Sequence, residues 1–135
     1  MNSSRGLTLI ELLVVVVIVA ILGAIAIPAY TNYLTRARRA DAKTALEQLR
    51  ASQEMFRAER GSYSTSLIQL VTSWGVPSAP GDYSILLNSS SATGFTGEGR
   101  PNTARQTPDG SLYVDQNGQK WDSDKVFYPN GKWAK

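Results

Sequence analysis

The chain has 135 residues and a formal net charge of +3 at pH 7, and it contains neither cysteine nor histidine. A charge this small does not by itself argue for nucleic-acid binding. Without histidine the chain lacks the commonest general base and metal ligand, and without cysteine no disulfide can brace its fold. No nucleophile motif, dinucleotide fingerprint or phosphate-binding loop occurs in the sequence, so we expect no enzyme activity and no cofactor.

A long apolar segment begins near the N-terminus. Residues 12–35 carry no charged side chain, and about 20 such residues suffice for a helix to cross the hydrocarbon core of a bilayer. Glu11 directly precedes this run, where an unpaired carboxylate is costly, and no cation of the same segment lies within helical reach. A cut after Gly6 would supply a partner, because the new amino group of Leu7 would lie four residues from Glu11 or near Glu11 of another copy.

At this junction the sequence resembles the precursors of the type IV pilins and of the related type II secretion pseudopilins. Those precursors have a short polar leader ending in Gly, a pattern close to F-T-L-I-E-L, and an apolar run that ends at a Pro. The chain follows this pattern without a gap at Gly6, Thr8, Leu9, Ile10, Glu11, Leu12 and Pro28. It departs where Leu7 replaces the usual Phe and where Ala20 and Gly23 shift the small-residue positions. Leu7 keeps the apolar character, so we still expect cleavage.

The resemblance implies a maturation pathway and a set of partners. A prepilin peptidase would remove residues 1–6 by cutting between Gly6 and Leu7, and would methylate the Leu7 amine. The chain would wait in the inner membrane with a periplasmic head until a pilus assembly platform adds it to an extracellular filament of identical or related pilin subunits. There Glu11 would pair with the Leu7 amine of a neighbour and fix the axial register, since a buried charge is costly unless it is paired.

Two residues inside the apolar run weaken the helix that it forms. Pro28 lacks a backbone N–H and clashes with the preceding turn, and Gly23 adds a weak point upstream. The sequence therefore predicts a helix kink at Gly23 and Pro28, where the resemblance implies that the helix loosens in the filament.

Two other interpretations of the N-terminus stay open. A Sec signal peptide would use Arg5 as its basic region and Ala24-Ile25-Ala26 as its cleavage site, and would leave a secreted soluble binding domain. A plain signal anchor would leave Glu11 reaching for the membrane surface. Because Glu11 interrupts the start of the apolar stretch, and because that stretch is long, pilin-like processing is the preferred hypothesis.

Beyond the apolar segment the pattern is that of an amphipathic helix. Apolar residues recur at three- and four-residue steps as far as Phe56, and Arg60-Gly61 is a typical helix end. We expect one helix over residues 7–60, with residues 7–35 in lipid or in a filament core and residues 36–60 carrying a folded head.

The basic cluster Arg36, Arg38 and Arg39 directly follows the apolar segment. It could contact nucleic acid or lipid headgroups, but a solvated helix face at the membrane boundary is the preferred interpretation. The positive-inside rule would place this cluster in the cytoplasm, whereas the resemblance implies a periplasmic head. We follow the resemblance, because the Gly6–Glu11 motif is far more specific than three charges.

Residues 61–135 predict a connecting loop, a small antiparallel sheet and a C-terminal loop. A short helical turn is expected at residues 66–72, and residues 88–102 indicate mostly loop apart from a strand near Gly94–Thr96. The other strands are expected at residues 82–87, 111–114 and 119–121, with a hairpin turn at Asn117-Gly118 and a second hairpin over residues 126–133. The side chains expected to face Leu46, Leu49 and Phe56 of the helix are Leu86, Leu112, Val114 and Trp121. The fold class is α+β, a long N-terminal helix packed against a small antiparallel sheet, as in type IV pilins.

The C-terminal loop lacks the disulfide that closes it in many pilins, so Trp121, Phe127 and Trp133 must help to hold it. The oxygen-bearing side chains that lie close together there are Asp115, Asn117, Asp122 and Asp124. A Ca²⁺ site is one interpretation, but the spacing is not that of an EF-hand. Turn-forming Asp and Asn are the preferred explanation, so no metal is expected.

Two classes of filament protein compete for the function. The first is a structural subunit of a type IV pilus, acting in adhesion, motility or DNA uptake. The second is a pseudopilin of a type II secretion system, whose short filament pushes substrates outward. The lack of a clear calcium loop favours the pilus subunit. Major or minor status stays open, and DNA is a possible partner that the sequence does not support.

Overall fold

The computed structural model describes residues 8–127 and 131–134. The chain divides into two compact units, Met1–Leu34 and Thr35–Lys135. Helix α1, Leu9–Arg60, contributes residues to both units. The predicted long helix is therefore confirmed from Leu9 onward, and Leu7 lies outside the described residues.

The described part of the first unit is almost entirely helix. Thr8 accepts a hydrogen bond from the backbone N–H of Glu11 through its Oγ1 atom, over 3.2 Å, and so caps the first turn. By length and composition, α1 contains a segment able to cross a membrane. The helix continues through Pro28, and the Thr31 hydroxyl donates to the Pro28 carbonyl over 2.9 Å. The kink at Gly23 and Pro28 stays a prediction.

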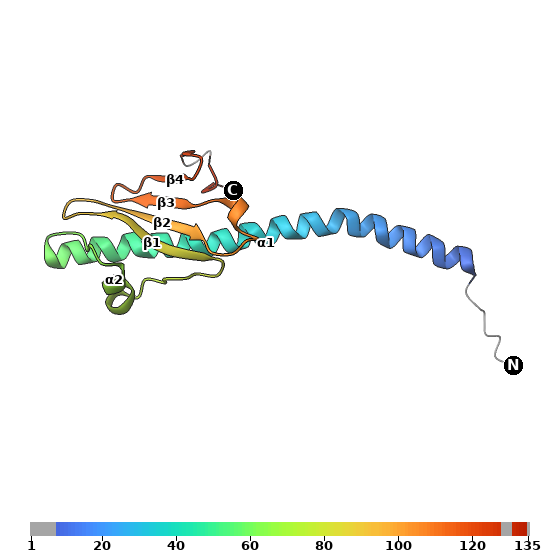
Figure 1. Cartoon of the computed structure of the whole chain (residues 1–135), viewed down its shortest axis with the longest axis horizontal. Coiled ribbons are helices and arrows are strands. Elements are labelled where there is room, and N and C mark those ends of the chain that lie inside the picture. Colours follow the sequence, from blue (N-terminus) through green and yellow to red (C-terminus); the bar gives the residue numbers. More distant parts are fainter. Residues whose placement is uncertain (1–7, 128–130, 135) are drawn as a thin grey trace. The chain divides into compact units, whose positions relative to one another are not determined.

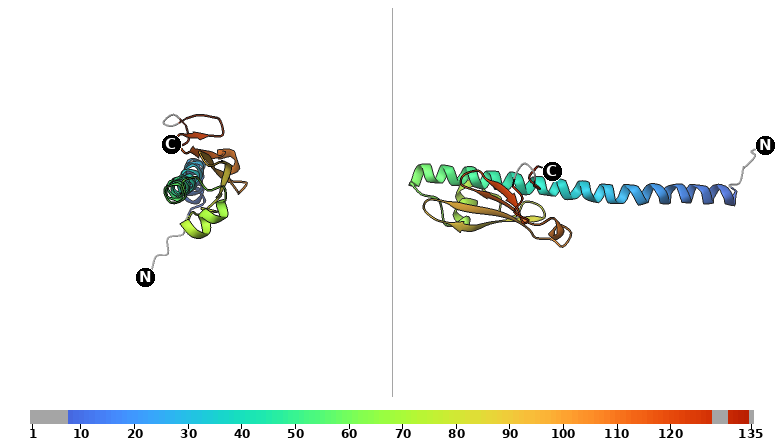
Figure 2. Two further views of the ribbon diagram at one scale, coloured as in Figure 1. Left: turned by 90° about the vertical axis from the view of Figure 1, so that its left-hand side faces the viewer. Right: turned by 90° about the horizontal axis from the view of Figure 1, so that it is seen from above.

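The second unit is the head, in which a four-stranded antiparallel sheet packs along α1 (Figures 1 and 2). The strands lie side by side in chain order: β1, Tyr83–Ser90; β2, Phe95–Pro101; β3, Leu112–Asp115; and β4, Lys120–Asp122. Helix α2, Leu67–Trp74, precedes the sheet, and the 3-10 turn η1, Thr107–Asp109, joins β2 to β3. The fold class predicted from the sequence is confirmed.

The core of the head lies between α1 and the inner face of the sheet. Leu46 and Leu49 are fully buried there against Leu112 and Val114. Burying one such side chain stabilises a fold by about 1.5–3 kcal/mol. Packing against the sheet therefore stabilises the head half of α1 more than helix propensity does.

The prediction that residues 88–102 are mostly loop is wrong, because β2 runs from Phe95 to Pro101. Its glycines indicate a loop when they are considered alone. In the fold, Gly97 and Gly99 face α1, and a Cβ on Gly97 would lie 2.5 Å from a methyl carbon of Leu49. The two glycines therefore allow β2 and α1 to approach each other closely.

Two of the residues expected in the core lie on the outer face of the sheet. In the register Leu86, Glu98, Tyr113 and Trp121 are successive partners across the four strands. Glu98 directly follows Gly97, which faces α1. Since neighbouring residues of a strand point to opposite faces, Leu86 and Trp121 point away from α1. Trp121 instead stacks on Tyr113, with ring centroids 5.5 Å apart.

The hairpin at Asn117-Gly118 is confirmed, since it joins β3 to β4. The second hairpin, over residues 126–133, is not formed by the described part of that segment. Phe127 makes an isolated bridge to Trp121 instead, and the Lys132 N–H donates to the Asp122 side chain. Residues 128–130 lie outside the described residues.

Candidate functional site

Of the predicted processing and assembly residues, the structure describes Glu11. Its side chain is exposed in the first turn of α1, where a carboxylate interacts favourably with the helix dipole. No cation pairs with it among residues 8–127 and 131–134. Gly6 and Leu7 lie outside the described residues, so cleavage between them and the pairing of Glu11 with the Leu7 amine stay predictions.

The arginine cluster after the apolar segment is divided between two carboxylates of the head. Arg39 is buried and donates through Nε to Oδ2 of Asp109 over 2.8 Å, with a second bond from its Nη2. Nε of Arg38 lies 2.8 Å from Oδ2 of Asp82. Arg36 is exposed. The interpretation of this cluster as a solvated face is therefore wrong for Arg39 and stays a prediction for Arg36.

Asp109 is the centre of a buried polar network. Its Oδ2 also accepts hydrogen bonds from the Tyr83 hydroxyl over 2.7 Å and from the Gln106 amide over 3.1 Å. Burial alone would raise the pKa of the Asp109 carboxyl, but the hydrogen bonds from Arg39 and Tyr83 outweigh burial and lower it. Burial also raises the pKa of the Tyr83 hydroxyl, and the bond to Asp109 adds to this. The network joins α1, β1 and η1 and leaves the tyrosine neutral.

The network was not visible in the sequence. Pro108-Asp109-Gly110 indicates a turn, but no local pattern points from Asp109 to an arginine on the long helix. From the sequence, Asp82 is predicted only to begin a strand. It also accepts two hydrogen bonds from Arg105, both of 2.9 Å, so two arginines share one carboxylate.

The carboxylates of the C-terminal region organise backbone turns. Oδ1 of Asp115 accepts the N–H groups of Asn117 and Gln119 over 2.9 and 2.8 Å. Asp122 is buried and accepts three further backbone N–H groups, those of Asp124, Val126 and Lys132. Asp115 ends β3 and Asn117 lies in the turn that follows it, whereas Asp122 ends β4 and Asp124 lies just beyond it. Within the described ranges no three His, Cys, Asp or Glu side chains are placed to hold a metal ion.

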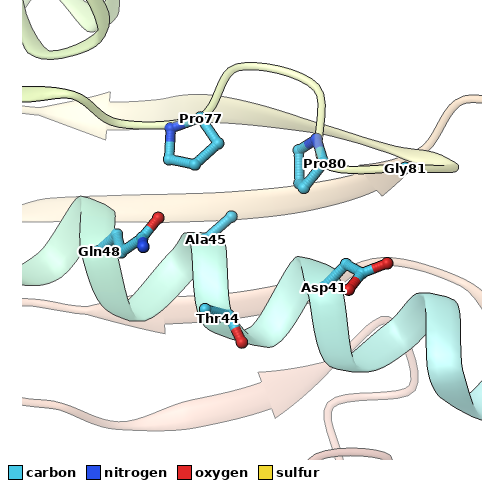
Figure 3. Close-up of a pocket in the computed structure, with 7 residues that line it drawn as sticks. All are labelled: Asp41, Thr44, Ala45, Gln48, Pro77, Pro80 and Gly81. Carbon is cyan, nitrogen blue, oxygen red and sulfur yellow. The ribbon is translucent and has the colours of Figure 1, made fainter.

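An open groove of about 370 Å³ lies between α1 and the segment that leads into β1. In Figure 3, Pro77 and Pro80 line the groove on the side of the segment before β1. Asp41, Thr44 and Gln48 line it on the side of α1. This lining offers one carboxylate and no neighbouring base or nucleophile.

Comparison with known proteins identifies family models and relatives that match this chain. A family model described as "Type IV minor pilin ComP, DNA uptake sequence receptor" matches residues 28–110, and a model of the prokaryotic N-terminal methylation motif matches residues 1–27. The type IV wide pilus major component PilA4 of Thermus thermophilus is 35% identical over 98 residues, covering 70% of this chain and 72% of that protein.

Other relatives match mainly through part of their length. The type IV major pilin PilA of Myxococcus xanthus is 46% identical over 61 residues, which are 45% of this chain and 28% of that protein. Prepilin peptidase-dependent protein D of Escherichia coli is 46% identical over 65 residues, 48% of this chain and 44% of that protein. The Neisseria meningitidis non-core minor pilin PilV has the same fold, with a TM-score of 0.55 and 16% identity over 67% of this chain and 88% of that one.

Proposed function

Because the chain belongs to the type IV minor pilin family described as ComP, DNA uptake sequence receptor, we propose that it is a structural subunit of a type IV pilus. A prepilin peptidase processes it, and it polymerises through its N-terminal helix. The family is one of structural pilins rather than of enzymes.

The observation that carries this proposal is the uncovered apolar half of α1. From Leu9 to Tyr33 the large apolar side chains are between 48% and 84% exposed. Such a continuous apolar surface needs lipid or other subunits to cover it. Lipid would cover it before assembly, and the helices of neighbouring subunits would cover it in the filament.

The match to the N-terminal methylation motif over residues 1–27 supports processing between Gly6 and Leu7. The Leu7 amine would then be the cation that pairs with Glu11 of the neighbouring subunit. Gly23 and Pro28 would let the helix loosen as it leaves the membrane.

The test is the intact mass of the mature chain, purified from the native membrane or from sheared surface filaments. A chain that begins at methylated Leu7 is the expected result. A chain that begins near Ile27 would instead identify a Sec-secreted soluble domain and would overturn the proposal.

The length of the filaments separates the two filament classes. A short filament that stays within the envelope would favour the type II secretion pseudopilin, whereas long surface filaments would favour the pilus subunit.

A second candidate function is binding of DNA by the filament, and the family description attached to residues 28–110 favours it. The exposed side chains of Arg100 and Arg105 offer guanidinium groups to phosphates, although each also pairs with a carboxylate of the head. Fluorescence anisotropy of a labelled duplex with the detergent-solubilised chain tests this. Binding that weakens linearly in log salt is expected for phosphate contacts, and unchanged anisotropy would exclude this candidate.

A further inference from the structure

Three arginines gather at the end of the head where the apolar segment joins it. We propose that, before assembly, Arg36, Arg38 and Arg105 bind the phosphates of anionic phospholipids at the membrane surface. This inference rests on the proposed membrane-anchored stage and adds a lipid partner for the head.

Chain connectivity places these arginines next to the bilayer. Thr35 is the first residue of the head unit and directly follows the apolar segment. Its backbone carbonyl accepts a hydrogen bond of 3.3 Å from the Gln106 side chain. The turn that contains Arg105 therefore lies beside Thr35, directly after the apolar segment. Arg36 follows Thr35 on α1.

The local charge is positive and partly unsatisfied. Arg38 and Arg105 both pair with Asp82, so one carboxylate faces two guanidinium groups and a positive charge is left over. The Arg105 side chain is 63% exposed despite this pairing. Arg36 is exposed and has no ion pair with any residue in the described part of the head. An added anion would therefore meet donors that the protein itself does not saturate.

Phosphate suits this arrangement. A guanidinium group binds phosphate oxygens through two parallel N–H bonds and is more weakly hydrated than an ammonium group. Basic residues just outside a membrane span are attracted to anionic headgroups, and the attraction is lost at high salt. A DNA phosphodiester offers the same oxygens, but chain connectivity holds the arginines at the membrane boundary, which favours lipid.

The experiment uses the full chain in nanodiscs of neutral phosphatidylcholine or of phosphatidylcholine with phosphatidylglycerol. Because the chain has no cysteine, Ala104→Cys places one spin label on the exposed residue next to Arg105. Collision of the label with a water-soluble nickel chelate is measured. We expect shielding in anionic nanodiscs only, with each arginine favouring the bound state about fivefold. Raising the salt to about 1 M, where the Debye length is about 3 Å, should abolish the shielding.

Charge variants separate lipid binding from misfolding. Arg36→Gln with Arg105→Gln should remove the shielding, whereas Arg36→Lys with Arg105→Lys should retain most of it. The matched control, Arg60→Gln with Lys125→Gln, removes the same charge from exposed residues elsewhere and should behave as the parent. Equal label accessibility in both lipids, or equal loss in the control, would overturn the inference.

Two further outcomes are informative. If duplex DNA shields the label while anionic lipid does not, the arginines form a nucleic-acid contact and the lipid assignment is wrong. If the chain fails to insert even into neutral nanodiscs, the membrane-anchored stage itself fails. Insertion without a response to anionic lipid rejects this inference alone.

Discussion

Arg39 and Asp109 form a buried ion pair across 70 positions of sequence, and this pair ties the long helix to the turn before β3. Tyr83 and Gln106 donate to the same carboxylate. The Gln106 side chain also donates to the backbone carbonyl of Thr35, so the turn contacts α1 at a second point. The pair thus holds the 3-10 turn η1 against α1 within the head.

Removing one member of this pair should destabilise the head strongly. Arg39→Gln leaves the Asp109 carboxylate buried without its counter-ion, and such losses cost about 3–5 kcal/mol. Replacing both partners, as in Arg39→Leu with Asp109→Leu, should cost less than the sum of the two single changes. Urea unfolding of the detergent-solubilised chain, followed by circular dichroism, gives the free energies. Strictly additive losses would show that the two residues act independently.

The buried carboxylates predict loss of stability in acid. Burial opposes ionisation of Asp122, but the N–H groups of Lys132, Val126 and Asp124 outweigh it and lower its pKa below the ordinary 3.8. Asp109 is shifted in the same direction. A carboxyl whose pKa is lower in the folded state contributes stability above its unfolded pKa and loses it as the pH falls through the folded value.

The free energy of unfolding should therefore stay level from neutral pH to about pH 5 and decline below about pH 4. Asp122→Asn removes the carboxylate and should flatten this decline. Asp124→Asn is a matched control, because that side chain is exposed. An unchanged acid slope in Asp122→Asn would assign the decline to other groups.

Gly97→Ala should disrupt the contact between sheet and helix. The added methyl group would lie 2.5 Å from Cδ2 of Leu49, and overpacking of this kind costs about 1–3 kcal/mol. Gly94→Ala is a control, since its nearest atoms belong to the flexible end of Gln116. Leu49→Val in the Gly97→Ala background should recover part of the loss in urea unfolding. Equal stability of both alanine variants would mean that α1 shifts enough to accommodate the added methyl group of β2.

Local patterns predicted the long helix, the order of elements and the hairpin at Asn117-Gly118, because each depends on neighbours in sequence. The extent of β2 could not be predicted, since Gly97 and Gly99 indicate a loop until the helix that they approach is known. The faces of Leu86 and Trp121 depend on strand register, which Gly-rich strands such as β2 specify weakly. Contacts such as Arg39 to Asp109 depend on tertiary structure alone. Among the candidate functional residues, the N-terminal motif was recognisable from local sequence, whereas the shared Asp82 carboxylate was not.

Glu11→Gln removes the charge at the start of the apolar helix and keeps the size of the side chain. Cleavage after Gly6 should continue, because the peptidase acts on the leader junction. Filament growth should fall sharply, because the Leu7 amine of a neighbouring subunit would lose its partner and would have to be buried unpaired. The intact mass of the membrane-bound chain reports cleavage, and the amount of subunit in the sheared surface fraction reports growth. Glu59→Gln is the matched control, since it removes an exposed carboxylate near the other end of the same helix. Normal filaments in Glu11→Gln would remove this residue from the assembly mechanism, whereas loss of cleavage would show that it acts earlier, in recognition by the peptidase.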